Sequence, residues 1–376
     1  MDVTGLPFDA DAMLAGLNDW VACESPTYDP AAVNRMMDLA ARDCALMGAR
    51  IERIPGRMGL GDSVRATFPH PKAGEPGILI LGHLDTVHPV GVLAKNPLRR
   101  EGDRAYGPGI CDMKGGNYLT LEAIRQLMRA GVETPLPITF LFTPDEEIGT
   151  PSVRDLVEAE AARAKAVLVP EPGHTGGGVT SGRYAIARFE IATTGKPSHA
   201  GARLSEGRSA IREMCKRIME IEAMTTEDCT FSVGVLHAGQ WVNCVSSRAE
   251  AQVLSMAKRQ EDLDRGVEAM LALAQPQAEV TFEVRRGVTR PVWEPDAGTL
   301  RLVEMAEALH KAVGMEFRHI SSGGGSDGNF TGAMGVPTLD GLGVEGGGVH
   351  TLGEYIEVPT LAARGRVMAG LLAGIA

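Results

Sequence analysis

Strand-like apolar runs alternate with helix-like patterns through the first half of this 376-residue chain, and this order constrains its fold most. Residues 77–82, 136–143 and 166–169 are apolar runs of strand length, whereas residues 30–48 and 118–130 carry apolar side chains at helical spacing. Helical patterns between strands predict a parallel or mixed α/β sheet with helices on its faces. Ligands bind such sheets beyond the carboxyl ends of the strands.

The pattern changes near residue 184 and changes back near residue 291. Strand-like segments follow one another at residues 185–193, 230–235, 248–256 and 279–284, beside a helix-like segment at residues 205–224. We therefore expect a discontinuous main domain of residues 1–183 and 291–376. A smaller α+β domain of residues 184–290 is inserted into it.

Composition excludes several classes of protein. The chain is 44% hydrophobic and 23% charged, which is typical of a globular protein, and its net charge of -11 disfavours a nucleic-acid surface. Neither a signal peptide nor an apolar run of roughly 20 residues is present, so we expect a cytoplasmic protein without a membrane partner. The six cysteines form no Cys-x-x-Cys pair, which argues against a thiolate zinc site or a disulfide framework.

A histidine and a carboxylate end the apolar run at residues 78–81. His83 and Asp85 are two residues apart, so in a strand both side chains point to the same side. One of these side chains can bind a metal, while the other orients the side chain that binds it. A hydrogen-bonded turn is the alternative interpretation of this pair taken alone.

Further histidine and acidic residues follow other predicted strands and glycine-rich loops. Together they form a candidate ligand set of His83, Asp112, Glu147, Glu171 and His350. Imidazole and carboxylate ligands without sulfur suit Zn²⁺, Mn²⁺ or Co²⁺. If Asp112 bridges two ions, each ion gains one histidine and one further carboxylate, and room remains for a shared water.

Glu146 stands beside Glu147 and is the natural general base. A metal that absorbs the charge of one acid leaves the other able to take a proton from water. A solvated acidic turn is the alternative for residues 145–147. Their position directly after the strand at residues 136–143 favours the catalytic interpretation.

One motif points elsewhere and is set aside. Residues 341–346 satisfy the G-x-G-x-x-G pattern of dinucleotide sites. No helix pattern follows them, and too little chain remains for a complete strand-helix-strand unit. A flexible loop that delivers His350 explains these glycines better.

Several motifs in order give the chain a resemblance to a known family. They are Gly-His-Leu-Asp-Thr-Val at residues 82–87, the glycine-rich residues 107–116, Asp-Glu-Glu at 145–147 with Gly149, Glu-Pro at 171–172, and Pro-Ser-His-Ala-Gly at 197–201. Across essentially its whole length the chain resembles the dinuclear zinc metallopeptidases related to carboxypeptidase G, aminoacylase and succinyl-diaminopimelate desuccinylase. The resemblance implies a zinc-exopeptidase-like mixed sheet flanked by helices, with an inserted lid and dimerisation domain.

The resemblance also implies roles for the candidate residues. Two Zn²⁺ ions per chain are expected, with Co²⁺ or Mn²⁺ as alternatives. Asp112 would bridge them, Glu147 and His350 would bind one ion, and His83 and Glu171 would bind the other. Asp85 would orient His83, Glu146 would be the base, and a cis peptide would follow Asp112.

Roles in the inserted domain rest on the resemblance alone. His199 would reach the partner subunit's site in a homodimer and stabilise the oxyanion, although an ordinary strand-end histidine is the alternative. Asn243 and Arg290 in this domain, and Gly325 in the main domain, match positions that hold a substrate carboxylate in the relatives. The match at Arg290 is loose, so a surface arginine is the alternative there. Met256 stands where carboxypeptidase G-like chains have an arginine, a departure that bears on fine specificity.

The expected function is hydrolysis of an amide or peptide bond in a small carboxylate-bearing molecule or short peptide. The closest expected activity is that of a glutamate carboxypeptidase, with a metal-bridged water and Glu146 as general base. An N-acyl-amino-acid deacylase of the aminoacylase or desuccinylase type is the alternative. An inactive binding homologue is a remote alternative, because Glu146 accompanies the complete ligand set.

Overall fold

The computed structural model describes residues 3–376, which divide into two compact units. Unit 1 consists of the described residues up to Gly182 together with Trp293–Ser322 and Ser326–Ala376. Unit 2 consists of Arg183–Val292 and Gly323–Gly325. Among residues 3–376, every helix is too short or too polar to cross a bilayer.

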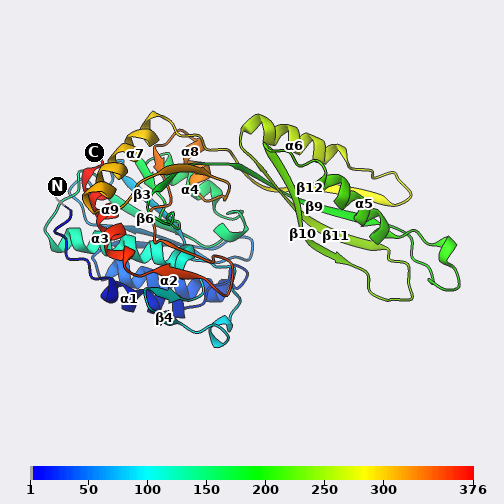
Figure 1. The fold of residues 1–376 in the computed structure, drawn as a ribbon, viewed down its shortest axis with the longest axis horizontal. Helices are drawn as coiled ribbons and strands as arrows, with labels where there is room; N and C mark the ends of the chain where they lie inside the picture. Colours follow the sequence, from blue (N-terminus) through cyan, green and yellow to red (C-terminus); the bar gives the residue numbers. More distant parts are fainter. Residues whose placement is uncertain (1–2) are drawn as a thin grey trace. The chain divides into compact units, whose positions relative to one another are not determined.

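A mixed sheet forms the centre of unit 1 (Figure 1), in the order β1-β2-β6-β3-β7-β14. Its strands are β1 (Arg50–Ile54), β2 (Ser63–Thr67), β3 (Ile78–His83), β6 (Ile138–Thr143), β7 (Ala166–Leu168) and β14 (Thr338–Leu339). Strands β6, β3, β7 and β14 are parallel, whereas β1 and β2 are antiparallel to their neighbours. The mixed α/β sheet predicted from the sequence is confirmed.

Helices cover both faces of this sheet. They are α1 (Ala10–Ala22), α2 (Pro30–Ala45), α3 (Gly115–Arg129), α4 (Arg154–Ala161), α7 (Ala297–Ala312), α8 (Gly328–Ala333) and α9 (Thr360–Gly374). Ile78 and Ile80 of β3 belong to the core shared with α1, α2, α3 and α9, whereas Leu79 and Leu81 pack in a second core with α4 and α8. Both faces of β3 are buried, which accounts for its unbroken apolar run at residues 78–81.

Local sequence sets where several of these helices begin. The carboxylate of Asp29 accepts a hydrogen bond from the Ala32 amide, and Pro30 occupies the first turn of α2. Asp296 caps α7 in the same way, through the Thr299 amide. Aspartate at the N-cap and proline in the first turn are favourable because the first amides of a helix lack helical partners.

Short strands join distant segments of unit 1. Strands β15 (Gly346–Gly347), β16 (Tyr355–Glu357), β5 (Arg104–Tyr106) and β4 (Arg99–Glu101) form one small sheet, and β13 (His319–Ser322) pairs with β8 (Val179–Arg183). The pairing of Tyr355 with Tyr106 brings the C-terminal loop beside the segment that leads to Asp112.

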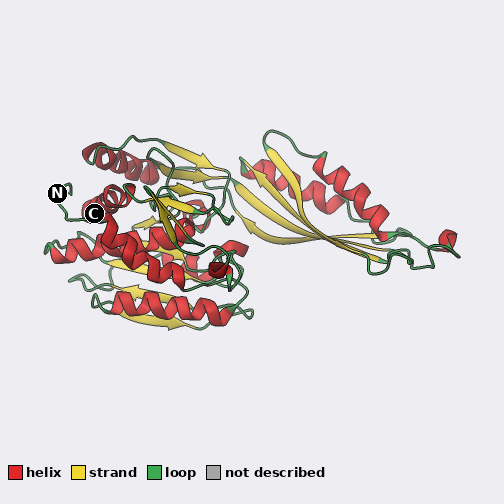
Figure 2. Cartoon of the chain, turned by 60° about the horizontal axis from the view of Figure 1, so that its bottom comes forward, coloured by secondary structure: helices red, strands yellow, loops and turns green. Residues whose placement is uncertain are grey.

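Unit 2 is an antiparallel sheet with helices on one face (Figure 2). Its sheet order is β10 (Cys229–Ala238), β11 (Arg248–Ala257), β9 (Ala185–Thr194) and β12 (Thr281–Arg290), with helices α5 (Ala210–Glu222) and α6 (Gln260–Ala272). Alternate residues of β11 are buried, as expected for a sheet with one covered face. Phe189 and Met270 belong to the core of this unit, which is separate from the cores of unit 1.

Candidate metal centre

Parallel strands bring three candidate segments to one edge of the main sheet. His83 is the last residue of β3 and pairs in register with Thr143, the last residue of β6. The turn with Glu146 and Glu147 follows β6, and Glu171 follows β7 on the other side of β3. The site therefore lies beyond the carboxyl ends of the strands, where sheets of this class bind ligands.

Asp112 approaches this edge from the segment just before α3. Gly116 in the first turn of α3 lies against the Pro170 carbonyl, so closely that an added Cβ would stand 1.8 Å from that oxygen. Only glycine permits such a close contact between α3 and Pro170. The contact places Asp112, which lies just before α3, near Glu171, which follows Pro170. The peptide bond between Asp112 and Met113 is cis, as the resemblance predicted.

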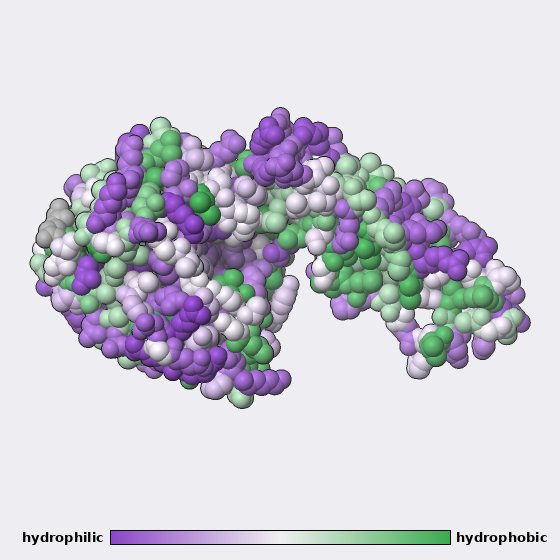
Figure 3. All heavy atoms as spheres, viewed as in Figure 1, coloured by the Kyte–Doolittle hydropathy of each residue, from purple (hydrophilic) through white to green (hydrophobic). Residues whose placement is uncertain are grey.

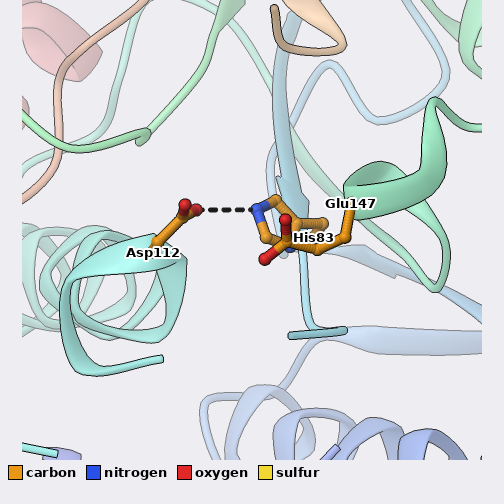
Figure 4. Close-up of side chains that lie close together, drawn as sticks. All are labelled: His83, Asp112 and Glu147. Carbon is orange, nitrogen blue, oxygen red and sulfur yellow. Dashed lines mark hydrogen bonds and ion pairs between the residues drawn. The ribbon is translucent and has the colours of Figure 1, made fainter. Parts of the chain in front are cut away.

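The two carboxylate oxygens of Asp112 face two different sets of side chains. Oδ1 lies 3.2 Å from His83 Nε2, which is 3.8 Å from Glu171 Oε1. Oδ2 lies 3.1 Å from His350 Nε2, which is also 3.1 Å from Glu147 Oε2. Figure 4 shows the contact between His83 and Asp112, with Glu147 beside them. The five predicted ligands thus form two sets that share Asp112.

Glu146 lies next to the His83 and Glu171 set. Its Oε2 is 4.0 Å from His83 Nε2. The candidate ligand atoms of His83, Glu146 and Glu171 lie within 4.8 Å of one another, as do those of His83, Asp112 and Glu147. The carboxylate of Glu146 thus lies directly beside the candidate ligands.

Burial and neighbouring charges shift the pKa values of the groups in this cluster. Burial, and then the nearby charge of Asp112, raise the pKa of Glu171, and burial also raises the pKa of Glu147. Burial opposes ionisation of Asp112, but hydrogen bonds from His350 and His83 outweigh it and lower the pKa of Asp112. Hydrogen bonds to Asp112 and Glu147 raise the pKa of His350 to about 10. The imidazoles and carboxylates of this cluster therefore shift one another's pKa values.

These residues fit divalent metal ions. Asp112, Glu147 and Glu171 offer hard oxygen ligands, and His83 and His350 direct Nε2 at them. A divalent cation would replace the imidazole protons and relieve the cost of the buried carboxylates. Nitrogen and oxygen donors in this combination are those that Zn²⁺, Mn²⁺ or Co²⁺ accept.

Asp85 contacts more than the imidazole that it was expected to orient. His83 Nδ1 is 2.9 Å from the Asp85 backbone oxygen and 3.4 Å from its Oδ1. The buried Asp85 carboxylate instead accepts hydrogen bonds from the amides of Glu146, at 3.1 Å, and Glu147, at 3.3 Å. The Thr27 hydroxyl donates a third hydrogen bond, at 2.6 Å. Asp85 therefore holds both β3 and the acidic turn after β6.

His350 has an unusual backbone conformation. Its φ of 63° lies in the left-handed region, where residues with a Cβ are uncommon. Its side chain is 54% exposed, whereas that of His83 is buried. Such conformations are frequent at functional sites, where surrounding structure holds them in place.

Sequence reasoning missed several residues that support the site. Thr27 contacts Asp85, and His88 contacts the buried carboxylate of Glu354. Glu354 also accepts hydrogen bonds from backbone amides around Asp112. The available signals were the second histidine in Gly-His-Leu-Asp-Thr-Val-His and the acid four residues after His350.

Within unit 2, the structure brings His199 and Asn243 together. The Ala200 amide donates to the Asn243 carbonyl at 2.9 Å, and His199 and Cys244 form a β-bridge. His199 Nδ1 accepts hydrogen bonds from the Gly201 and Ala202 amides. The neutral ring therefore carries its proton on Nε2, where it can be donated.

The other expected substrate contacts also meet in unit 2. Arg290 is buried at the end of β12 and pairs with Ile186 of β9. A Cβ on Gly325 would stand 2.8 Å from Arg290 Cδ and 2.6 Å from Ile186 Cδ1. Arg290 is therefore not the surface arginine considered as an alternative.

The chain belongs to a known family of hydrolases. The pattern of Peptidase family M20/M25/M40 matches residues 79–374. The chain is 36% identical over 304 residues to carboxypeptidase G2 from Pseudomonas sp. (strain RS-16), covering 77% of this chain and 72% of that protein. These matches confirm the predicted family and define the chain as a metallopeptidase.

More distant relatives agree with this assignment. A succinyl-diaminopimelate desuccinylase from Thioalkalivibrio sulfidiphilus is 24% identical over 318 residues, covering 79% of this chain and 83% of that protein. The crystal structure of an M20 family metallo-carboxypeptidase from Sulfolobus solfataricus superimposes with a TM-score of 0.76 at 17% identity, covering 96% of this chain and 98% of that one. The predicted fold is thereby confirmed.

Proposed function

We propose that this metallopeptidase hydrolyses an amide or peptide bond in a small carboxylate-bearing substrate, most like a glutamate carboxypeptidase. The observation that carries the proposal is the division of Asp112 between two ligand sets, one on each carboxylate oxygen. His83 and Glu171 form one set, and His350 and Glu147 form the other. We assign one divalent ion to each set, with zinc as the expected metal and Co²⁺ or Mn²⁺ as alternatives.

Glu146 is assigned the proton transfers. When bound, the metal ions supply Lewis acidity that polarises the amide carbonyl and makes water more acidic. The Glu146 carboxylate, whose amide is held by Asp85, accepts the proton of the attacking water. It then returns that proton to the departing amine. The adjacent Glu147 faces His350 instead, so the two neighbouring acids have different tasks.

Residues of unit 2 are assigned to the substrate. His199, with its transferable donor at Nε2, is proposed to stabilise the oxyanion in the partner subunit's site. Arg290, Asn243 and Gly325 are proposed to bind the substrate carboxylate, because a guanidinium and backbone amides suit that group. Carboxypeptidase G2, the relative at 36% identity, supports a carboxypeptidase activity.

Unit 2 is proposed to act as a lid and to form a homodimer. Large apolar side chains remain exposed on it, including Trp241 at 72%, Val242 at 102% and Leu204 at 62%. Figure 3 shows hydrophobic patches on the visible face of this unit. Exposed apolar side chains favour association, and sedimentation of the intact chain at dimer mass is the expected result.

A panel of amides tests the proposed reaction. We expect the zinc-loaded enzyme to cleave peptides with C-terminal glutamate faster than N-acyl amino acids or neutral dipeptides. Removal of metal by a chelator should abolish cleavage, and added Zn²⁺ should restore it, with release of the amine as the measurement. Full activity in metal-free enzyme would contradict the proposal. A clear preference for N-acyl amino acids would instead favour a deacylase.

Two variants measured on the same panel separate the roles. Glu146→Gln should lose about 100- to 10,000-fold in kcat yet keep most of its bound zinc, because Glu146 is proposed as the base rather than a ligand. His199→Ala should lower kcat with metal content unchanged. Wild-type turnover in either variant would remove that residue from the mechanism.

A further inference from the structure

Glu354 is a buried carboxylate outside the predicted site. Its side chain is 1% exposed. Oε1 accepts hydrogen bonds from the amides of Cys111, at 2.8 Å, and Asp112, at 3.0 Å. Oε2 accepts one from the Gly109 amide at 2.9 Å and lies 2.9 Å from His88 Nε2. A carboxylate only accepts, so the imidazole donates in this last contact.

The donors lie in chain segments that each carry residues of the metal centre. His88 follows Asp85 by three residues, and Glu354 itself follows His350 by four. One of the amides belongs to Asp112, the residue shared by both ligand sets. The backbone adds a further tie, since the Gly107 amide donates to the Glu354 carbonyl at 3.2 Å. Glu354 thus joins three ligand-bearing segments that are far apart in sequence.

The chemistry of these contacts makes them strong and directional. Hydrogen bonds to an ionised carboxylate are about twice as strong as those between neutral groups. Loss of the acceptor would leave buried amides unpaired at the turn that aims Asp112. Glu354 points both oxygens at these donors, so its role differs from that of the ligand acids.

We propose that Glu354 is a positioning residue that fixes Asp112 between the two metal positions. This inference rests on the proposed function, since Glu354 would position residues that are proposed to bind the metal ions. Outer partners of metal ligands typically change affinity about 10- to 100-fold when they are removed. The same carboxylate ties the loop of His350 to the segment of Asp112, so loss of Glu354 should weaken both metal positions.

Metal affinity of the folded chain tests the proposal. Glu354→Gln removes the negative charge and turns an amide N–H toward the donors. We expect its dissociation constants for Zn²⁺ and Co²⁺, measured by competition with a chromophoric chelator, to rise about 10- to 100-fold. The visible absorption spectrum of bound Co²⁺ should also change, because Asp112 would be aimed differently. The melting temperature of each metal-free variant is recorded alongside.

Glu357→Gln is the matched control. Glu357 lies three residues further on, in β16, and contacts Arg104 at 2.9 Å near the surface. Its loss should leave affinity and the cobalt spectrum at parental values. Glu354→Asp serves as a second variant that keeps the charge but is too short to reach every donor, and it should also bind metal more weakly.

The outcomes are distinct. In one outcome, folded Glu354→Gln binds metal with parental affinity, gives an unchanged cobalt spectrum and shows only a lower melting temperature. That result would make Glu354 a purely structural residue and overturn the inference. If Glu354→Gln does not fold, parental affinity in Glu354→Asp has the same meaning. A parental chain that binds neither Zn²⁺ nor Co²⁺ would instead contradict the proposed function.

Discussion

At the scale of single residues, Asp85 controls two parts of the centre at once. Its backbone oxygen meets His83 Nδ1, and its carboxylate meets the amides of Glu146 and Glu147. The position of the His83 imidazole therefore depends on the backbone of Asp85. The position of the turn with Glu146 and Glu147 depends on the charge of the Asp85 side chain. A substitution that keeps shape but removes charge should affect the turn more than the histidine.

Asp85→Asn is therefore expected to lower kcat/KM about 10- to 100-fold. The amide group presents an N–H where a carboxylate accepted hydrogen bonds, so the turn with the base and one ligand shifts. Steady-state kinetics with zinc in excess is the measurement. Thr27→Val removes one donor but keeps the charge, and it should cost less. Equal activity of Asp85→Asn and the parent would show that the turn does not need Asp85.

Sequence reasoning could find residues with a local signal but not those defined by distant contacts. His83 and Asp112 were predicted because each stands in a recognisable motif beside a strand or glycines. Asp85 was also predicted, but its hydrogen bonds reach amides 61 and 62 positions away. The donors to Glu354 lie more than 240 positions before it. Such pairings depend on tertiary packing, which a local pattern does not encode.

At the scale of elements, the same distinction applies. The apolar run at β6 and the helical pattern of α3 were predicted because apolar side chains recur regularly along each element. β4 is Arg99–Glu101, a strand of charged exposed residues that exists only through its pairing with β5. The helices α1 and α6 were not predicted.

Helices α7 and α9 meet through a buried polar pair. His310 Nδ1 lies 2.7 Å from the Ala306 carbonyl, and its Nε2 lies 3.1 Å from Nη1 of Arg364. One ring nitrogen must donate and the other accept, which requires a neutral imidazole. Burial, and then the charge of Arg364, lower the pKa of His310 to about 4.

Stability of this helix pair should consequently decrease in acid. Below about pH 6.5 the unfolded chain gains a proton on His310 that the folded chain does not accept until about pH 4. Across that window the pair should lose about 3 kcal/mol of unfolding free energy. Urea unfolding of metal-free protein at a series of pH values measures the loss. His310→Gln should be less stable at pH 7 but lack this part of the pH dependence; an unchanged slope would contradict the assignment.

At the scale of the whole molecule, we expect the two units to respond differently to metal. Each has its own hydrophobic core, with Ile80 and Phe140 in one core of unit 1 and Phe189 and Met270 in that of unit 2. Every predicted metal ligand lies in unit 1. A ligand that binds only the folded form stabilises the part of the chain that binds it.

Calorimetry is therefore expected to resolve two unfolding transitions, of which zinc raises only one. Zinc at 100 times its dissociation constant adds about 2.7 kcal/mol per site, enough to raise the melting temperature of unit 1 by roughly 5–10 °C. The transition of unit 2 should stay at its metal-free temperature. Asp112→Asn, which lacks the shared ligand, should show little or no zinc-dependent shift. A single transition that zinc moves as a whole would mean that the two units unfold together, because the stabilisation of one would then reach the core of the other.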